Sequence, residues 1–205
     1  MLMKKAESQN NIKGETQMNI CVYGASSDDI APEYIAETEA LGAELARRGH
    51  GLVFGGGGHG LMGAAARGAV SAGGTVCGVA PRFFESDGIL FARCTTLIRT
   101  ETMRERKEKM EQLSDAFIMA PGGIGTFEEF FEVLTLRQLG RHNKPIAVFN
   151  VRGYFDPLLA AMRHAADEGF LGEQCFDLFT VTDDGAALLD ALARPQPPAE
   201  PQKPV

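Results

Sequence analysis

The segment from Pro121 to Glu129, with the sequence Pro-Gly-Gly-Ile-Gly-Thr-Phe-Glu-Glu, combines the residue types that bind an anion with a pair of carboxylates. An apolar run at 115–120 predicts a buried strand before it, and apolar residues at helical spacing over 127–139 predict a helix after it. Glycines let a backbone approach a ligand closely, and the first turn of a helix offers unpaired N–H groups at the positive end of its dipole. This strand-to-helix turn therefore predicts a phosphate site, to which the Thr126 hydroxyl adds a donor.

Glu128 and Glu129 follow the glycines closely, and two explanations are open for them. Carboxylates in the first turn of a helix stabilise its dipole, by about 0.3–1 kcal/mol each. Adjacent residues on a helix point about 100° apart, so the two side chains cannot share one role. We expect one of them to face solvent and the other to face the ligand, where it would hold sugar hydroxyls or activate water.

A second glycine-rich segment runs from Gly55 to Gly63, with the sequence Gly-Gly-Gly-Gly-His-Gly-Leu-Met-Gly, after the apolar run 51–54. It satisfies the G-x-G-x-x-G pattern, which by itself is a weak sign of dinucleotide binding. The next predicted strand, 75–80, leads into Pro81-Arg82 rather than the acidic residue that binds the ribose of NAD. We therefore interpret the segment as backbone lining a nucleotide pocket, and the sequence leaves open whether His59 contacts a ligand or solvent. The chain contains no G-x-x-x-x-G-K-[ST] pattern, which excludes a P-loop.

The stretch 101–113 alternates charges of both signs, which usually indicates the solvent-exposed face of a helix. Arg106 and Lys107 border its apolar side, which two methionines and a leucine mark, so either side chain could reach an inner pocket. The preceding stretch 82–94, which carries Glu85, is irregular. We expect it to form a lid or a wall over that pocket.

Short apolar runs alternate with helical patterns along the chain. We expect strands at 19–24, 51–54, 75–80, 95–99, 115–120, 145–149 and 178–181, and helices at 32–48, 64–72, 101–113, 127–139, 154–166 and about 184–193. This alternation predicts an α/β fold with a parallel sheet covered by helices on both faces. Ligand loops then gather at the carboxyl ends of the strands. The loop with Gly24 and Ser26, which a plain turn would explain equally well, would join the two glycine-rich segments there.

At 205 residues the chain is expected to hold one domain, at 18–193, with a disordered extension at 1–17 and a disordered proline-rich tail at 194–205. Its net charge of −7 argues against a broad nucleic-acid surface. Four scattered cysteines without a C-x-x-C pair indicate reduced thiols in a cytoplasmic protein. The histidines form no i, i+4 pair, and no apolar run is long enough to span a membrane or act as a signal peptide. We expect no metal, no cofactor and no membrane contact.

With these segments identified, the chain resembles the LOG family, also labelled lysine-decarboxylase-like, whose members are cytokinin riboside 5′-monophosphate phosphoribohydrolases. The resemblance runs from about 18 to 193 and rests on three motifs. P-G-G-x-G-T-x-x-E matches Pro121–Glu129, G-G-G-x-x-G-L-M-G matches Gly55–Gly63, and R-K-x-x-M matches Arg106–Met110. The resemblance implies a Rossmann-like fold, usually a homodimer. It also implies hydrolysis of the N-glycosidic bond of an adenosine 5′-monophosphate, often N6-modified, to the free base and ribose 5-phosphate.

By position, the resemblance implies that Arg106 and Glu129 are the catalytic pair. From the motifs and the loops of the expected sheet, the residues predicted to bind the substrate are Gly24, Ser26, Gly57, Met62, Glu85, Arg106, Lys107, Gly122, Gly123, Ile124, Gly125, Thr126, Glu128 and Thr135. Arg104, Leu136-Arg137 and the stretch 82–94 depart from the family pattern and bear on which base is accepted. The decarboxylase label implies pyridoxal chemistry, for which the sequence gives no support.

Cleavage of a glycosidic bond builds positive charge on the ribose ring, and a fixed carboxylate stabilises that charge as it forms. We assign this role to Glu129, which can also hold or deprotonate the attacking water. Arg106 would position the ribose hydroxyls or that carboxylate, while binding of the phosphate at the glycine turn orients the sugar. The alternative is a nucleotide-sensing or carrier protein without turnover, which would not need both residues together. A third hypothesis, an NAD(P) oxidoreductase, predicts a bound nicotinamide cofactor.

Overall fold

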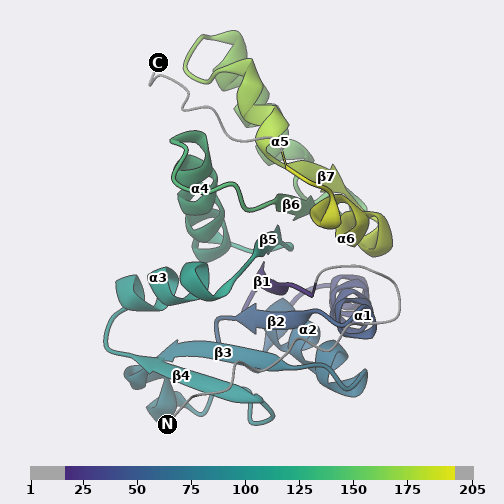
Figure 1. Cartoon of the computed structure of the whole chain (residues 1–205), viewed down its shortest axis with the longest axis vertical. Coiled ribbons are helices and arrows are strands. Elements are labelled where there is room, and N and C mark those ends of the chain that lie inside the picture. The colour runs from purple at the N-terminus through teal and green to yellow at the C-terminus, as the bar shows by residue number, and fades with distance from the viewer. Residues whose placement is uncertain (1–16, 197–205) are drawn as a thin grey trace, which may run out of the picture.

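The computed structural model of the chain describes residues 17–196. The strands in this part of the chain are β1 (Asn19–Tyr23), β2 (Gly51–Phe54), β3 (Val76–Pro81), β4 (Thr96–Thr100), β5 (Ala116–Met119), β6 (Ile146–Phe149) and β7 (Thr180–Thr182). They form one parallel sheet in the order β4-β3-β2-β1-β5-β6-β7 (Figure 1). The predicted α/β, Rossmann-like fold is confirmed.

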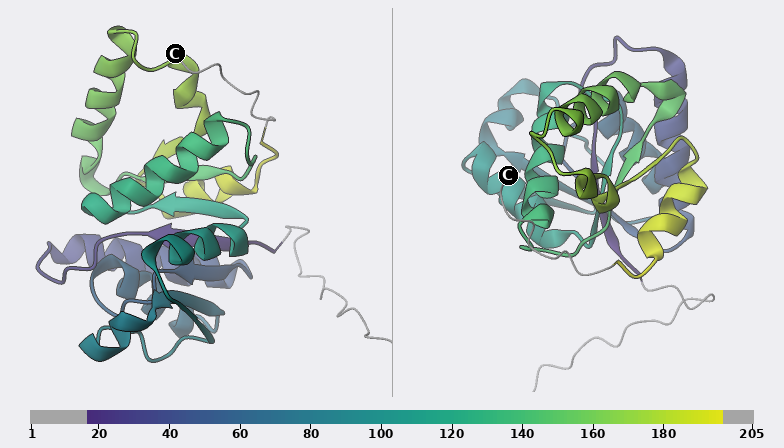
Figure 2. Two further views of the ribbon diagram at one scale, coloured as in Figure 1. Left: turned by 90° about the vertical axis from the view of Figure 1, so that its left-hand side faces the viewer. Right: turned by 90° about the horizontal axis from the view of Figure 1, so that it is seen from above.

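The helices between the strands are α1 (Pro32–Arg47), α2 (Gly60–Ser71), α3 (Met103–Leu113), α4 (Ile124–Gln138), α5 (Asp156–Asp167) and α6 (Gly185–Ala193). Helices α1, α2 and α6 pack on one face of the sheet, and α3, α4 and α5 pack on the other (Figure 2). Asp184 caps α6, because its side chain accepts hydrogen bonds from the amides of Ala186 and Ala187. No helix in the described residues is long and apolar enough to cross a membrane.

The core consists of two apolar clusters, one on each face of the sheet. Successive side chains of a strand point to opposite faces, so β1 contributes Ile20 and Val22 to one cluster and Cys21 and Tyr23 to the other. A strand that is buried on both sides must be apolar throughout, which explains why the strands read as continuous apolar runs.

The direction of strand order reverses at β1, which pairs with β2 on one side and with β5 on the other. The loops that follow β1 and β5 lead to α1 and α4, which pack on opposite faces of the sheet. A crevice therefore opens outside the carboxyl ends of β1 and β5, where open parallel sheets bind their ligands.

Two glycines explain how closely α2 approaches α1. A Cβ atom added at Gly68 would lie 1.9 Å from the carbonyl oxygen of Glu39, and one added at Gly42 would lie 2.2 Å from that of Ala65. The two helices therefore pack backbone against backbone, and the small residues of α2 serve this contact as well as the contact with the sheet. This packing fixes the position of the glycine-rich loop that begins α2.

The structure differs from the predicted element boundaries at α4, which begins at Ile124 rather than at Phe127. Gly123 is the N-cap and has an extended backbone, so the helix starts inside the glycine motif. Gly125 and Thr126 consequently lie in the first turn, where backbone N–H groups have no partner within the helix. The predicted extension at 1–17 and tail at 194–205 lie outside the described residues, apart from Gln17 and 194–196.

Candidate active site

A cavity of about 470 Å³ opens at the carboxyl edge of the sheet, in the crevice between β1 and β5. The loops after β1, β2 and β5 all contribute to its wall, as the sequence predicted for the three glycine-bearing loops. The predicted residues that line it are Gly24, Ser26, Gly57, Met62, Arg106, Gly123, Ile124, Gly125, Thr126 and Glu129. The convergence follows from the parallel sheet, because all strand ends of one kind lie at the same edge.

The two helix N-termini that follow the glycine-rich segments, those of α2 and α4, lie beside this cavity, and of these two only that of α4 is open to an anion. At α2, the Asp28 carboxylate accepts the Gly60 amide at 2.7 Å, and the Ala25 carbonyl accepts the Leu61 amide at 2.8 Å. At α4, the N-cap is Gly123 and no side chain caps the helix. The first turn of α4 therefore offers the donors and the positive dipole end that a phosphate needs.

Arg106 and Glu129 form a buried ion pair at the bottom of the cavity. The Arg106 Nη1 atom donates to Glu129 Oε1 at 2.6 Å, and its Nε atom donates to the Val79 carbonyl at 3.2 Å. The side chains are 5% and 10% exposed. Burial raises the pKa of the Glu129 carboxyl above its ordinary 4.5, although the Arg106 charge and hydrogen bond oppose this rise. The cavity therefore contains a carboxylate whose ionised form depends on its arginine partner.

The 82–94 stretch forms a wall of the cavity, through a short helix (Arg82–Asp87) and the loop after it. The Gly58 amide donates to the Ile89 carbonyl at 2.7 Å, and the Phe91 amide donates to the Gly56 carbonyl at 2.8 Å. These bonds fasten the stretch to the glycine-rich loop before α2. Ile89 and Phe84 line the cavity, and the sequence analysis did not identify either of them.

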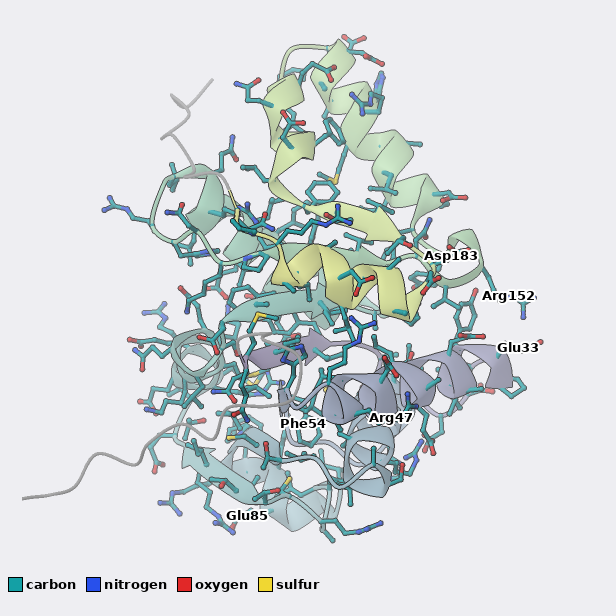
Figure 3. The ribbon with its side chains drawn as sticks, turned by 45° about the vertical axis from the view of Figure 1, so that its right-hand side comes forward. Glu33, Arg47, Phe54, Glu85, Arg152 and Asp183 are labelled. Atoms are coloured by element: carbon teal, nitrogen blue, oxygen red, sulfur yellow. The ribbon has the colours of Figure 1, made fainter. Side chains whose placement is uncertain are left out.

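Tyr154 supports the glycine motif from behind, which the sequence did not predict. Its hydroxyl donates to the Gly122 carbonyl at 2.8 Å, and its ring packs edge-on against Tyr34. Next to these rings, Arg152 pairs with Glu33 at 2.9 Å, and both residues are labelled in Figure 3. Arg152 has a φ of 56°, a strained conformation for a non-glycine residue. The loop after β6 therefore holds the motif against the start of α1.

The family described as "possible lysine decarboxylase" matches residues 62–192. A protein of Rhodococcoides fascians named cytokinin riboside 5′-monophosphate phosphoribohydrolase is 39% identical over 181 residues, which cover 88% of this chain and 91% of that protein. The chain belongs to the LOG family. An Arabidopsis thaliana protein of the same name is 37% identical over 173 residues, covering 84% of this chain and 81% of its own length.

Solved structures of lower sequence identity share the fold. The molybdenum cofactor carrier protein of Chlamydomonas reinhardtii superposes with a TM-score of 0.66 at 24% identity, covering 87% of this chain and all of that one. A molybdenum cofactor binding protein of Rippkaea orientalis has a TM-score of 0.66 at 20% identity, with 85% and 94% of the two chains covered. Likeness at this level of identity shows the common architecture alone.

Five residues predicted to bind the substrate are not among those that line the cavity, namely Glu85, Lys107, Gly122, Glu128 and Thr135. Lys107 and Glu128 pair with each other on the outer side of α3 and α4, next to their inward-facing neighbours Arg106 and Glu129. Consecutive helical residues diverge by about 100°, so only one member of each pair can point inward.

Glu85 pairs with Arg99 of β4 and lies at the lower end of the molecule in Figure 3, away from the cavity lining. Thr135 is exposed on α4, more than two turns beyond the glycine motif. Gly122 lies directly behind the motif, where its carbonyl accepts the Tyr154 hydroxyl. The role of each of these residues as a substrate contact remains a prediction.

The family is described as a possible lysine decarboxylase, a name that implies a pyridoxal cofactor. The residues of the cavity decide whether it could hold that cofactor or a metal ion. A pyridoxal enzyme needs a lysine amine in the cavity, and the lining contains no lysine. The nearby Lys107 amine is held outside by Glu128 and by Glu132, the latter at 3.0 Å. Among residues 17–196, no group of three or more His, Cys, Asp or Glu side chains is placed to hold a metal ion. The donor set therefore does not fit the decarboxylase label.

Gly55→Ala is expected to displace the Arg106 guanidinium and to lower kcat/KM by about 10²-fold. A Cβ atom at Gly55 would lie 1.9 Å from Arg106 Nη2, and that side chain is already fixed by Val79 and Glu129. The φ angle is not in the left-handed region, so the clash alone accounts for the effect. Steady-state kinetics and thermal melting measure it, with Gly125→Ala, where a Cβ meets no protein atom, as the melting control. Unchanged kinetics of Gly55→Ala would show that the guanidinium position is unimportant.

Proposed function

We propose that this LOG-family protein hydrolyses the N-glycosidic bond of a nucleoside 5′-monophosphate of the adenosine class, including N6-modified forms. The products would be the free base and ribose 5-phosphate. One observation carries the proposal: the buried Arg106–Glu129 pair opens into the same cavity as the uncapped N-terminus of α4. A phosphate site next to a fixed carboxylate is the arrangement that this reaction needs. The names of the homologues in Rhodococcoides fascians and Arabidopsis thaliana support the same activity.

In the proposed reaction, the amides of Gly123–Thr126 bind the 5′-phosphate and orient the ribose over Glu129. The bond between C1′ and the base nitrogen breaks, and its electron pair leaves with the base. Positive charge then spreads over C1′ and the ring oxygen, where the Glu129 carboxylate stabilises it. The oxygen of a water molecule bonds to C1′, and the proton of that water passes to Glu129. The phosphate contact is remote from the bond that breaks, so its binding energy serves to position the sugar.

Arg106 has a separate role in this scheme. Burial disfavours the charged form of the Glu129 carboxyl and raises its pKa. The guanidinium provides a countercharge at 2.6 Å and fixes one carboxylate oxygen. The other oxygen remains available to the ribose or to water.

The experiment that tests this proposal compares AMP, N6-isopentenyl-AMP and adenosine as substrates of the purified protein. We expect ribose 5-phosphate from at least one of the two nucleotides, and a much slower release of ribose from adenosine, which lacks the phosphate. Stoichiometric nucleotide binding without product would instead favour the alternative of a sensing or carrier protein. Tightly bound nicotinamide cofactor after purification would favour the oxidoreductase.

The pH dependence of the reaction is expected to reflect the raised pKa of Glu129. The carboxylate must be ionised to stabilise the cation and to accept a proton, so kcat/KM should fall as Glu129 becomes protonated. Because its pKa lies above 4.5, the fall should have its midpoint above pH 4.5 rather than at that of an exposed glutamate. Initial rates between pH 4 and 8, at low substrate concentration, measure it, with fluorescence confirming that the fold persists. A midpoint at or below pH 4.5 would contradict the assignment.

We also propose a homodimer located in the cytoplasm. On the outer side of α4 the large apolar residues Phe131 and Leu139 are 36% and 44% exposed, and a second chain would cover them. Light scattering of the purified protein tests the dimer. The cytoplasmic location is supported by the free cysteines at 21, 77, 94 and 175, which fit a reducing compartment.

A further inference from the structure

His59 and Asp28 form a close side-chain pair at the wall of the cavity. The His59 Nδ1 atom lies 2.5 Å from Asp28 Oδ2, and Asp28 Oδ1 accepts the Gly60 amide at 2.7 Å. The Gly60 amide and then His59 lower the pKa of the Asp28 carboxyl, so the carboxylate form is favoured. Since Asp28 occupies Nδ1, the imidazole has Nε2 left for another partner. The histidine is therefore oriented by a carboxylate that is itself fixed to the backbone.

The proposed hydrolysis leaves one chemical requirement unmet by Arg106 and Glu129. The departing purine carries the electron pair of the broken bond, and protonation of a ring nitrogen makes it a better leaving group. The ionisable side chains in the cavity wall are His59, Arg106 and Glu129. A guanidinium keeps its proton at any physiological pH, and Glu129 receives the proton of water. Among the described side chains of this wall, the His59 imidazole is the remaining group that can donate a proton to a leaving base.

The position of His59 agrees with this requirement. The phosphate and the base of a nucleotide lie on opposite sides of its sugar. With the phosphate at the start of α4 and the sugar over Glu129, the base would lie against the remaining wall. That wall is made by the loop before α2, the first turn of α2 and the 82–94 stretch, and its side chains are Met62, Phe84, Ile89 and His59. Three of them are apolar and suit the faces of a purine, so His59 is the proton donor among them.

We propose that His59, held by Asp28, is the general acid that protonates the leaving purine. This inference rests on the proposed phosphoribohydrolase function. The proton moves from His59 Nε2 to a purine ring nitrogen such as N7 as the bond between C1′ and N9 breaks. The water adds to C1′ and gives its proton to Glu129. Glu129 then releases that proton to solvent and His59 takes one up from solvent, so both groups return to their starting forms. The net reaction consumes one water and yields neutral base and ribose 5-phosphate.

The test uses a substrate that needs no proton donor. In 7-methyl-AMP, methylation at N7 places the positive charge on the base in advance. We expect His59→Gln to lower kcat for AMP by about 10²-fold and kcat for 7-methyl-AMP by less than about threefold. Asp28→Asn keeps an oxygen for the Gly60 amide but removes the charge, so it should lower kcat for AMP less, and have no further effect in the His59→Gln background. His164→Gln, an exposed histidine of α5, is the matched control.

The outcomes separate the two proposals. Equal losses on both nucleotides, or no loss on either, would overturn the role of His59. A wild-type protein that releases ribose 5-phosphate from none of AMP, N6-isopentenyl-AMP and 7-methyl-AMP would overturn the proposed function instead. The His59 side chain is 56% exposed, so its replacement should not unfold the protein, and thermal melting of each variant verifies this.

Discussion

Glu129→Gln is expected to reduce the turnover of a nucleoside 5′-monophosphate by about 10³-fold or more, with KM changed only a few-fold. In the wild-type protein, Arg106 Nη1 donates to Glu129 Oε1 at 2.6 Å. The amide has the same shape as the carboxyl and still offers an oxygen to this donor. It carries no charge, so it cannot stabilise the ribosyl cation or accept the proton of water. Binding of the nucleotide depends mainly on the amides at the start of α4, which the substitution does not touch. Single-turnover kinetics and titration calorimetry measure the two effects separately.

Glu132→Gln is the matched control for this experiment. Glu132 lies one turn further along α4, its side chain is 42% exposed, and it pairs with Lys107 outside the cavity. We expect its removal to leave kcat within about twofold, as for most exposed ion pairs. Full turnover in Glu129→Gln, or an equal loss in Glu132→Gln, would refute the assignment of Glu129.

Arg106→Met is expected to lower the free energy of unfolding by about 3–5 kcal/mol at neutral pH and to abolish most activity. The substitution leaves the Glu129 carboxylate buried without its countercharge, and the cost is that of a desolvated lone charge. The sign of the pH effect follows from the same argument. Below the folded pKa of Glu129 the carboxyl is neutral, so the difference in stability between the variant and the wild type should shrink as the pH falls. Denaturant unfolding at several pH values measures this.

The double variant Arg106→Met with Glu129→Gln distinguishes this explanation from simple loss of packing. Without the carboxylate there is no lone charge to bury, so the double variant should be more stable than Arg106→Met alone. Arg104→Met, an exposed arginine of the same helix, should change stability by less than about 0.5 kcal/mol. A double variant as unstable as Arg106→Met would mean that the aliphatic packing of Arg106, and not its charge, stabilises the fold.

The agreement between sequence and structure is closest where a feature depends on neighbouring residues. The parallel sheet follows from apolar runs that alternate with helical patterns, and the cleft follows from the strand ends that such a sheet gathers at one edge. The motif at Pro121–Glu129 predicts its own strand, turn and helix because glycine and first-turn preferences act over a few residues. The start of α4 was misplaced, since Gly123 as N-cap admits three more residues to the helix. The last predicted strand, 178–181, began two residues before β7 (Thr180–Thr182).

Features that require two distant segments could not be predicted in the same way. The sequence predicted that Glu128 and Glu129 diverge, and family resemblance selected Glu129. The spacing of the apolar residues did not distinguish Arg106 from Lys107. The contact between α3 and α4 places Arg106 in the cavity and Lys107 outside it. The role of Tyr154 depends on a hydrogen bond between residues 32 positions apart, which no local pattern records.

The amino-acid sequence by itself determined the elements of this protein, their order in an α/β fold, and the glycine turn that can bind a phosphate. These depend on backbone preferences and on apolar periodicity, which are local properties. The tertiary structure alone decided which helix end stays open, because Asp28 and the Ala25 carbonyl occupy the end of α2 and leave that of α4 to a ligand. It also decided which charges meet in the cavity, since burial and pairing depend on how separate elements pack.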